Sequence, residues 1–314
     1  MMSDQRQLPL FASQPTTVAD LSIHTRLVDA IPFFQVHLHS QGKTQHTIDA
    51  FTADLELLTE YHGDAQSLGW YTTSRLNDFL VWMEERRGVP CSRKTYARRV
   101  TTLKVLFRWL KEIEAIPHDP ANALLQRSGP APLAVILTSD ETESVMAHAR
   151  SLRFGDKPDA RPELLFRLIL STGIKKSEAV RLIPDDIQAD TAGGWQVFIR
   201  HEGAKDRYRE RFLPLESTIK PALDAYLSQY SPQTRLFTCT ARNLEYILED
   251  LGKDVGIPSK ISFEMLRWMY GVRAFLAELD PNSIRERLGL SEISWLETLG
   301  KIKQLAVKYY PAQL

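Results

Sequence analysis

The segment Thr172-Gly173-Ile174-Lys175-Lys176-Ser177-Glu178 decides the fold, because three further blocks follow it in order along the chain. These blocks are a cationic segment centred on Lys205, the tetrapeptide Glu264-Met265-Leu266-Arg267, and the tripeptide Leu288-Gly289-Leu290. The first segment follows an apolar run that opens with Pro162. Proline commonly begins a helix and glycine commonly ends one. We therefore expect a helix that stops at the glycine, then a hairpin, then further helices.

The residues between the first two blocks have the pattern of a β-hairpin. Residues 195–200 alternate apolar and polar side chains, and residues 211–215 do so again after a loop, as two paired strands require. Apolar residues at helical spacing predict helices over 217–229, 241–252, 262–278 and 281–289. Ser294 with Glu297 resembles a capping box for a last helix, and Thr138 or Ser139 suits the start of the first one. The region 137–314 is thus predicted to be mainly helical with a small antiparallel sheet.

The N-terminal part is predicted to be a separate all-helical domain over residues 22–128. Apolar residues recur at helical spacing in 47–58 and 75–83, and Ser92 suits the N-cap of a third helix. Residues 129–136 contain two closely spaced prolines and are expected to be a linker. Residues 1–21 are polar and are expected to form a disordered tail. The fold class is therefore mainly α in two domains, with the sheet in the second.

Composition excludes several classes of protein. No apolar run approaches the roughly 18 residues that cross a bilayer, so we expect no membrane partner. Cys91 and Cys239 are isolated, without the spacing of a metal site or of a disulfide framework. We expect neither a metal nor another cofactor. Isolated cysteines suit a reducing cytoplasm, which is the expected location.

Charge is balanced overall but unevenly distributed. The formal net charge is zero and the pI is about 7.1, whereas nucleic-acid-binding domains often exceed a pI of about 9. Between Glu85 and Glu112, however, there is no acidic residue. The basic residues of this stretch are Arg86, Arg87, Arg93, Lys94, Arg98, Arg99, Lys104, Arg108 and Lys111. Local potential governs phosphate attraction more than the total charge does, so this stretch is a candidate nucleic-acid contact.

The four blocks, in this order, resemble those of the tyrosine recombinase (phage integrase) family in its two-domain form. The segment 92–110 is similar to the signature helix of that family's core-binding domain, and Asp119-Pro120-Ala121 is similar to the motif that follows it. The resemblance implies a SAM-like core-binding domain and a catalytic-type domain that together clamp duplex DNA. It implies that the 92–111 helix approaches the major groove and that the hairpin approaches the backbone. The expected DNA contacts are Arg93, Lys94, Arg98, Arg99, Lys104, Lys205, Arg207 and Arg267.

The resemblance also assigns catalytic positions, and most of them hold other residues here. Lys175 occupies the place of the first arginine, Glu264 that of the first histidine, and Leu290 that of the second histidine. The nucleophilic tyrosine is expected near Leu299. Lys205 and Arg267 match the family pattern, as the hairpin lysine that acts as general acid and as the retained arginine. We therefore expect a degenerate site in which Glu264 repels phosphate or pairs with Lys175 or Lys176.

Three functions stay open on the sequence. The favoured one is a cytoplasmic, nucleoid-associated protein that binds duplex DNA without cutting it, alongside an active recombinase or a second copy of itself. A working recombinase would need a displaced nucleophile, and Tyr309 or Tyr310 are the candidates. The neutral pI also permits a protein-interaction module that has lost DNA binding.

Overall fold

The structure is a computed structural model that describes residues 14–126, 132–154, 156–191, 193–201 and 209–311. The chain divides into two compact units, unit 1 (Met1–Ala131) and unit 2 (Pro132–Leu314). Three of the sequence predictions fall largely or wholly outside the described residues. These are most of the disordered tail, the first part of the linker, and the hairpin residues Lys205 and Arg207.

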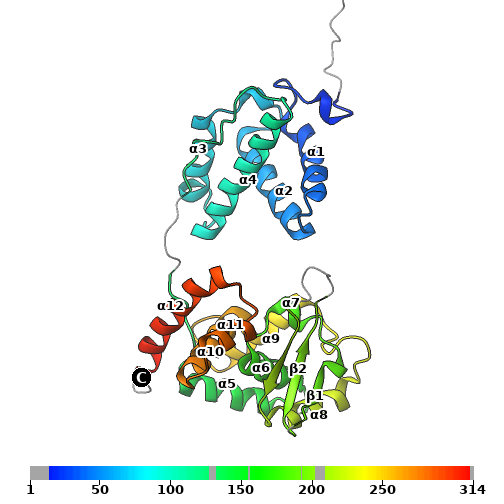
Figure 1. The fold of residues 1–314 in the computed structure, drawn as a ribbon, viewed down its shortest axis with the longest axis vertical. Helices are drawn as coiled ribbons and strands as arrows, with labels where there is room; N and C mark the ends of the chain where they lie inside the picture. Colours follow the sequence, from blue (N-terminus) through cyan, green and yellow to red (C-terminus); the bar gives the residue numbers. More distant parts are fainter. Residues whose placement is uncertain (1–13, 127–131, 155, 192, 202–208, 312–314) are drawn as a thin grey trace, which may run out of the picture. The chain divides into compact units, whose positions relative to one another are not determined.

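Unit 1 is all-helical, as predicted (Figure 1). Its helices are α1 (Leu27–Ser40), α2 (Gln45–His62), α3 (Thr73–Val81) and α4 (Arg93–Glu112), and α3 continues into a π-helical turn, Trp82–Arg86. Short 3-10 turns lie at Val18–Asp20 and Leu68–Trp70. Ser92 is the N-cap of α4, where its hydroxyl accepts from the Thr95 N–H. The apolar stripe of α4 packs against the other helices in one buried core.

Unit 2 combines helices with a three-stranded antiparallel sheet, so the predicted fold class is confirmed. The strands are β1 (Ile187–Ala189), β2 (Trp195–Ile199) and β3 (Arg211–Leu215), in that order across the sheet. The helices are α5 (Ser139–Ser151), α6 (Arg161–Thr172), α7 (Lys176–Ala179), α8 (Ile219–Tyr230), α9 (Ala241–Asp254), α10 (Phe263–Leu276), α11 (Pro281–Arg287) and α12 (Glu292–Tyr309). A 3-10 turn at Pro184–Asp186 leads into β1. Helix α6 is almost wholly buried and packs against α5, α8, α9 and α10.

The structure differs from the sequence prediction at three local points. Strand β1 was not predicted, because three residues are too few to show alternation. The last helix begins earlier than Ser294 implies: Ser291 is its N-cap and accepts from the Ser294 N–H. Thr138, rather than Ser139, caps α5, with Glu141 completing the capping box. At both helix caps two nearby hydroxyl residues satisfied the same pattern, and only packing selects between them.

Candidate functional site

Arg267 joins three of the four sequence blocks. It lies on α10, partly buried, and its guanidinium donates to the carbonyl oxygens of Gly173 and of Leu288, the latter at 3.1 Å. These carbonyls belong to the C-terminal ends of α6 and α11, where unpaired carbonyl groups carry the negative end of the helix dipole. Gly173 is required here, since its φ is +61° and a Cβ would lie 2.7 Å from the Tyr270 ring. Arg267 therefore links the glycine block to the Leu288 block.

Lys175 approaches the same point from α7. Its backbone N–H donates to Glu178 Oε2 at 2.8 Å, and its Nζ donates to the Gly289 carbonyl at 3.3 Å. Lys175 is itself the N-cap of α7. Gly289 has a φ of +60°, and a Cβ there would lie 3.2 Å from the Arg211 guanidinium. Gly289 thus allows the Arg211 guanidinium to approach the backbone closely.

Glu178 is the buried carboxylate at the centre of this cluster. Arg211 binds it with two hydrogen bonds of 3.0 and 3.1 Å, and Arg211 Nε also donates to the Arg287 carbonyl at 2.9 Å. His201 Nε2 lies 3.7 Å from Glu178 Oε1. We name Lys175, His201, Arg211 and Arg267, grouped around Glu178, the cationic cluster.

Sequence reasoning missed the roles of Arg211 and His201, although strand alternation carries the signal. Side chains two apart share one face of a strand. Leu213 and Leu215 are buried, which places Arg211 on the core face of β3. Val197 and Ile199 are buried on β2, and continuing that alternation places His201 inward as well. Arg200 alternates to the other side and pairs with Asp186 at 2.6 Å.

The electrostatics of the cluster show an excess of positive charge. Burial lowers the pKa of Lys175, and Arg267, Arg211 and Arg209 lower it further while Glu178 opposes them. Burial lowers the pKa of Arg267 to about 10, with Arg211 adding to the effect. Burial would raise the pKa of Glu178, but the hydrogen bonds and charge of Arg211 outweigh it and the pKa is lowered. An anion at this point would relieve the repulsion among the cations.

The residues that differ from the family pattern have other roles in the fold. Glu264 is exposed in the first turn of α10, where an acidic side chain favours the helix dipole. Among the described residues Lys176 pairs with Glu245 at 2.7 Å and Lys175 with a carbonyl, so the expected pairing with Glu264 is wrong. Leu290 and Leu299 are partly buried and pack against the core of unit 2. Lys205 and Arg207 lie outside the described residues.

Tyr309 and Tyr310 lie at the far end of α12 from the cationic cluster. Helix α12 begins next to Leu290, and 17 residues at about 1.5 Å each place Tyr309 roughly 25 Å along it. The Tyr309 hydroxyl accepts from the Ile136 N–H at 3.4 Å, and the Tyr310 hydroxyl donates to the Leu137 carbonyl at 3.2 Å. Burial raises the pKa of Tyr310. Both tyrosines therefore hold the segment that precedes α5.

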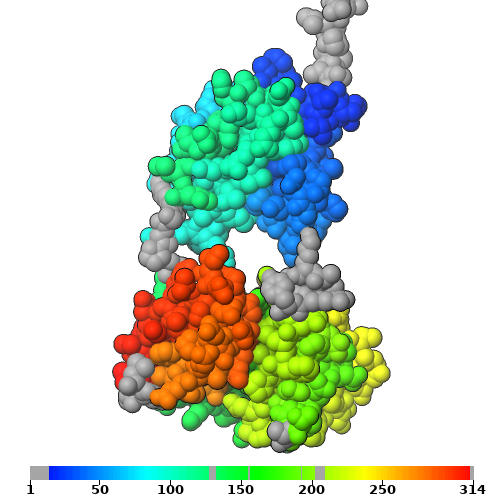
Figure 2. All heavy atoms as spheres, in the orientation of Figure 1, coloured from blue at the N-terminus to red at the C-terminus, as the bar shows by residue number. Residues whose placement is uncertain are grey.

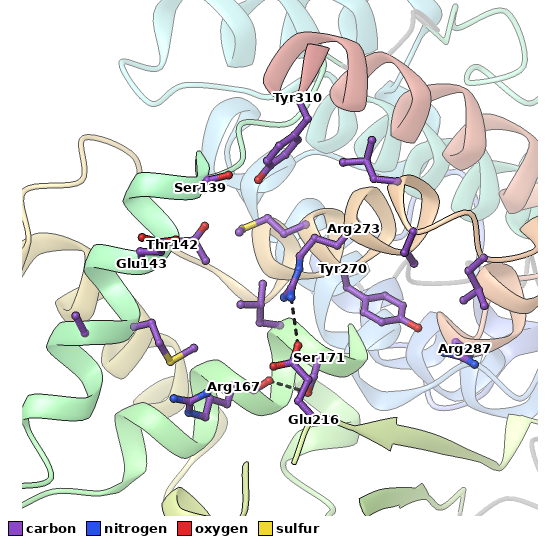
Figure 3. Close-up of a pocket in the computed structure, with 18 of the residues that line it drawn as sticks. Ser139, Thr142, Glu143, Arg167, Ser171, Glu216, Tyr270, Arg273, Arg287 and Tyr310 are labelled. Atoms are coloured by element: carbon purple, nitrogen blue, oxygen red, sulfur yellow. Dashed lines mark hydrogen bonds and ion pairs between the residues drawn. The ribbon is translucent and has the colours of Figure 1, made fainter. Parts of the chain in front are cut away.

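A groove of about 970 Å³ lies on the α5, α6 and α10 side of unit 2 (Figure 3). Tyr310, Ser139 and Tyr270 line it, together with several charged side chains. Two of its arginines pair with carboxylates: Arg273 pairs with Glu216 at 3.2 Å, and Arg167 with the buried Glu163 at 2.9 Å. The four residues of the cationic cluster do not line this groove.

The predicted DNA contacts of unit 1 divide into two groups on α4. Arg93, Lys94, Lys104, Arg108 and Lys111 fall on the outward face at helical spacing. Arg98 and Arg99 fall toward α2, where both donate to the buried Asp54, at 2.8 and 3.2 Å. The Arg98 side chain is 37% exposed and that of Arg99 only 11%. The outward five residues, named the basic face of α4, are therefore better placed for a phosphate than Arg99.

No group of three or more His, Cys, Asp or Glu side chains has the arrangement of a metal site in the part of the chain that the structure describes. None of the described helices is both long and apolar enough to cross a membrane.

Unit 1 is helical, and in unit 2 the sequence blocks around Gly173, Arg267 and Leu288 meet at the cationic cluster. This arrangement is the architecture of the site-specific integrases. The chain belongs to the phage integrase family. The profile of the family matches residues 136–298, and that of the phage integrase N-terminal SAM-like domain matches residues 31–113.

Curated relatives span most of the chain. Tyrosine recombinase XerD of Listeria innocua is 25% identical over 291 residues, covering 88% of this chain and 94% of the relative. Tyrosine recombinase XerC of Lacticaseibacillus casei is 24% identical over 305 residues, covering 90% and 98%. Among solved structures, the XerH recombinase bound to difH in a post-cleavage complex has a TM-score of 0.67 at 21% identity, covering 83% of this chain and 78% of that one. A lambda integrase dimer bound to a COC′ core site has a TM-score of 0.68 at 16% identity, covering 87% and 77%. The last two are similarities of fold.

Proposed function

We propose that this protein binds duplex DNA through the basic face of α4 and the cationic cluster, and that it does not cleave DNA. The cationic cluster carries the binding part of the proposal, because its cations exceed its single buried carboxylate and depress one another's pKa values. The five residues on the basic face of α4 supply a second positive surface. The relatives that resemble this chain include recombinases bound to their DNA sites.

The absence of cleavage rests on three positions. Attack on a phosphodiester needs a nucleophile, an acid for the leaving oxygen and donors aimed at the transition state. Glu264 and Leu290 supply no such donor, and Leu299 has no hydroxyl. Loss of one oxyanion-type donor costs about 10² to 10³ in rate. The retained cations hold a phosphate equally before and during attack, which does not accelerate the reaction.

The alternative nucleophiles receive little support from their surroundings. Tyr309 and Tyr310 are committed to the Ile136–Leu137 backbone, and a raised pKa makes Tyr310 a weaker nucleophile. An interaction module without DNA binding would leave the excess charge of the cationic cluster without a use. On DNA, the partner is an active recombinase or a second copy of this chain.

The proposal is tested in two steps. Selection from random duplexes first yields a bound sequence, and failure to select any at low salt would refute DNA binding. A nicked suicide duplex containing the selected site is then incubated with the protein and separated on a denaturing gel. We expect no covalent protein–DNA band. A band that disappears in Tyr309→Phe or Tyr310→Phe would refute the proposal and identify the nucleophile.

A variant with the family residues restored provides the matched control. It carries Lys175→Arg, Glu264→His, Leu290→His and Leu299→Tyr, the residues that the family pattern places there. All four positions are at the surface or partly buried, so the fold should tolerate the changes. A covalent band from this variant, but not from the natural chain, would show that the loss of activity is caused by these four residues and not by the surrounding fold.

A further inference from the structure

A smaller pocket, of about 370 Å³, lies in unit 2 where the segment after α7 meets the loop between α8 and α9. Two hydrogen bonds hold these segments together. The Leu236 N–H donates to the Leu182 carbonyl at 2.6 Å, and Arg235 Nη1 donates to the Arg181 carbonyl at 2.8 Å. In Figure 2 the green-to-yellow part of the chain, which contains both segments, forms one side of unit 2.

The lining of this pocket is rich in groups that bind anions. Arg181 and Arg235 lie on it together with Thr234 and Thr238. Among the described residues that line it, none is acidic. Guanidinium groups and hydroxyls donate hydrogen bonds to phosphate oxygens, and arginine does so through its planar fork. The pocket therefore presents donors to an anion without a carboxylate that would compete for them.

Arg181 lacks a counter-charge within the described part of the chain. Its side chain is partly buried, its Nε is buried without a hydrogen-bond partner, and no described carboxylate pairs with it. Asp159, whose charge acts on the neighbouring Cys239 thiol, is already bound by Arg161 at 2.7 Å. A partly buried cation without a counter-charge costs free energy. An anion in the pocket would supply the missing charge.

We propose that this pocket, named the Arg181 pocket, binds a phosphate group through the Arg181 and Arg235 side chains. Its volume is near the lower end of ligand sites, which span about 300–1,000 Å³, and suits a group of this size. A phosphate of the DNA backbone and a free phosphate present the same oxygens. The proposal does not rest on DNA binding, because no residue of the cationic cluster lines the pocket.

The Cys239 thiol reports whether the pocket is occupied, because it lies on the wall. The chain has two cysteines, so Cys91→Ser leaves Cys239 as its one thiol. Burial raises the pKa of this thiol, so the reaction is run at alkaline pH. The rate of modification by N-ethylmaleimide is measured by intact mass, in inorganic phosphate and in chloride of equal ionic strength. We expect phosphate to slow the reaction and chloride not to.

Substitution of Arg181 tests which side chain holds the phosphate. Arg181→Gln should raise the phosphate concentration that gives half-protection by about 10- to 100-fold, the usual contribution of hydrogen bonds to a charged group. Arg181→Lys keeps the charge but loses the fork, so its effect should be smaller. Arg150→Gln is the matched control, because Arg150 is an exposed arginine of unit 2 that lines the larger groove. It should behave as the natural chain, and full protection in Arg181→Gln overturns the proposal.

A duplex that contains the selected sequence separates the two sources of phosphate. A backbone phosphate in the pocket means that the duplex protects Cys239 and that Arg181→Gln lowers the salt slope of binding by about one. A free phosphate means that inorganic phosphate protects Cys239 and the duplex does not. If neither protects Cys239, the Arg181 pocket is not a phosphate site, whether or not the protein binds DNA. If no duplex is selected, DNA binding fails and protection by inorganic phosphate alone decides this proposal.

Discussion

Asp54 in unit 1 and Glu178 in unit 2 are both buried carboxylates that lie between cations, but the two networks have opposite electrostatic outcomes. Asp54 of α2 accepts from Arg98, Arg99 and the Thr102 hydroxyl. Burial, the largest effect, raises its pKa despite these partners. Glu178 accepts from Arg211 and from the Lys175 N–H, and these bonds outweigh burial so that its pKa is lowered. Side-chain exposure is almost equal, at 3% and 1%, so the partners make the difference.

The difference separates a structural network from a candidate binding site. In unit 1 the two arginines tie α4 to α2, and Arg98 also donates to the Ala50 carbonyl at 2.7 Å. In unit 2 the Glu178 carboxylate neutralises Arg211. The side chains of Lys175 and Arg267 donate to backbone carbonyls instead. Carbonyl dipoles neutralise less charge than a carboxylate does. Unit 2 therefore retains positive charge that a phosphate would neutralise.

The largest expected effect is on stability, and it should be greater in unit 2. Glu178→Gln leaves the Arg211 guanidinium buried without a counter-charge, which costs about 3–5 kcal/mol. Asp54→Asn should cost about 1–3 kcal/mol, because burial raises the pKa of Asp54 and the fold therefore stabilises its charge less than that of Glu178. Hydrogen exchange read on peptides of α6 and α10, and separately on α2 and α4, measures each unit by itself. A larger loss in Asp54→Asn would contradict the comparison.

The next effect is on the salt dependence of DNA binding. Each neutralised phosphate contributes about −0.9 to the slope of log K against log salt. Arg93→Ala with Lys94→Ala should reduce that slope by about two, and Lys175→Ala should reduce it by about one. Lys220→Ala with Lys253→Ala is the control, since both lysines are exposed but already paired with carboxylates. An unchanged slope in the Arg93→Ala/Lys94→Ala variant would show that these two residues of α4 do not contact DNA phosphates.

Much of the fold follows from the sequence because its signals are local. Apolar spacing identified the helices of both units, and strand alternation identified β2 and β3. The choice of cap at Ser291 over Ser294, and at Thr138 over Ser139, could not be made from the sequence. Both members of each pair satisfy the local pattern, and only the tertiary packing of the helix decides.

The candidate site was predictable in part. The order and spacing of the blocks predicted that Lys175 and Arg267 belong to one site. In the structure Arg267 donates to the carbonyls of Gly173 and Leu288, and Lys175 donates to that of Gly289. Counting basic residues placed Arg99 among the DNA contacts, because composition does not show which cations are held by a buried acid. Asp54 is 45 residues away from Arg99 in the sequence, so their pairing is a property of the fold.

A third prediction concerns the opposite directions in which the fold shifts the pKa values of the two carboxylates. The raised pKa of Asp54 means that it protonates above its unfolded value of 3.8, whereas Glu178 protonates below its unfolded 4.5. Glu178 thus contributes stability that is present above pH 4.5 and is lost as the pH falls through its folded pKa. Asp54 has the opposite sign: its contribution is present below pH 3.8 and is lost as the pH rises through its folded pKa. Carboxyl carbon NMR should show the pKa of Asp54 above 3.8 and the pKa of Glu178 below 4.5. A shift of either pKa in the opposite direction would contradict the comparison.

The smallest expected effect isolates one hydrogen bond of the unit 1 network. Thr102 is fully buried, and its hydroxyl donates to Asp54 at 2.9 Å. Thr102→Val keeps the shape but removes this donor, so unit 1 should lose about 1 kcal/mol. The pKa of Asp54 should rise further, because the Thr102 bond is one of the interactions that lower it.

Thr101→Val is the matched control, since the Thr101 hydroxyl donates to the Ala97 carbonyl and makes no bond to a carboxylate. It should leave the Asp54 titration unchanged. If Thr102→Val also left it unchanged, the two arginines alone would set the charge state of Asp54, and the contrast with Glu178 would rest on arginine geometry.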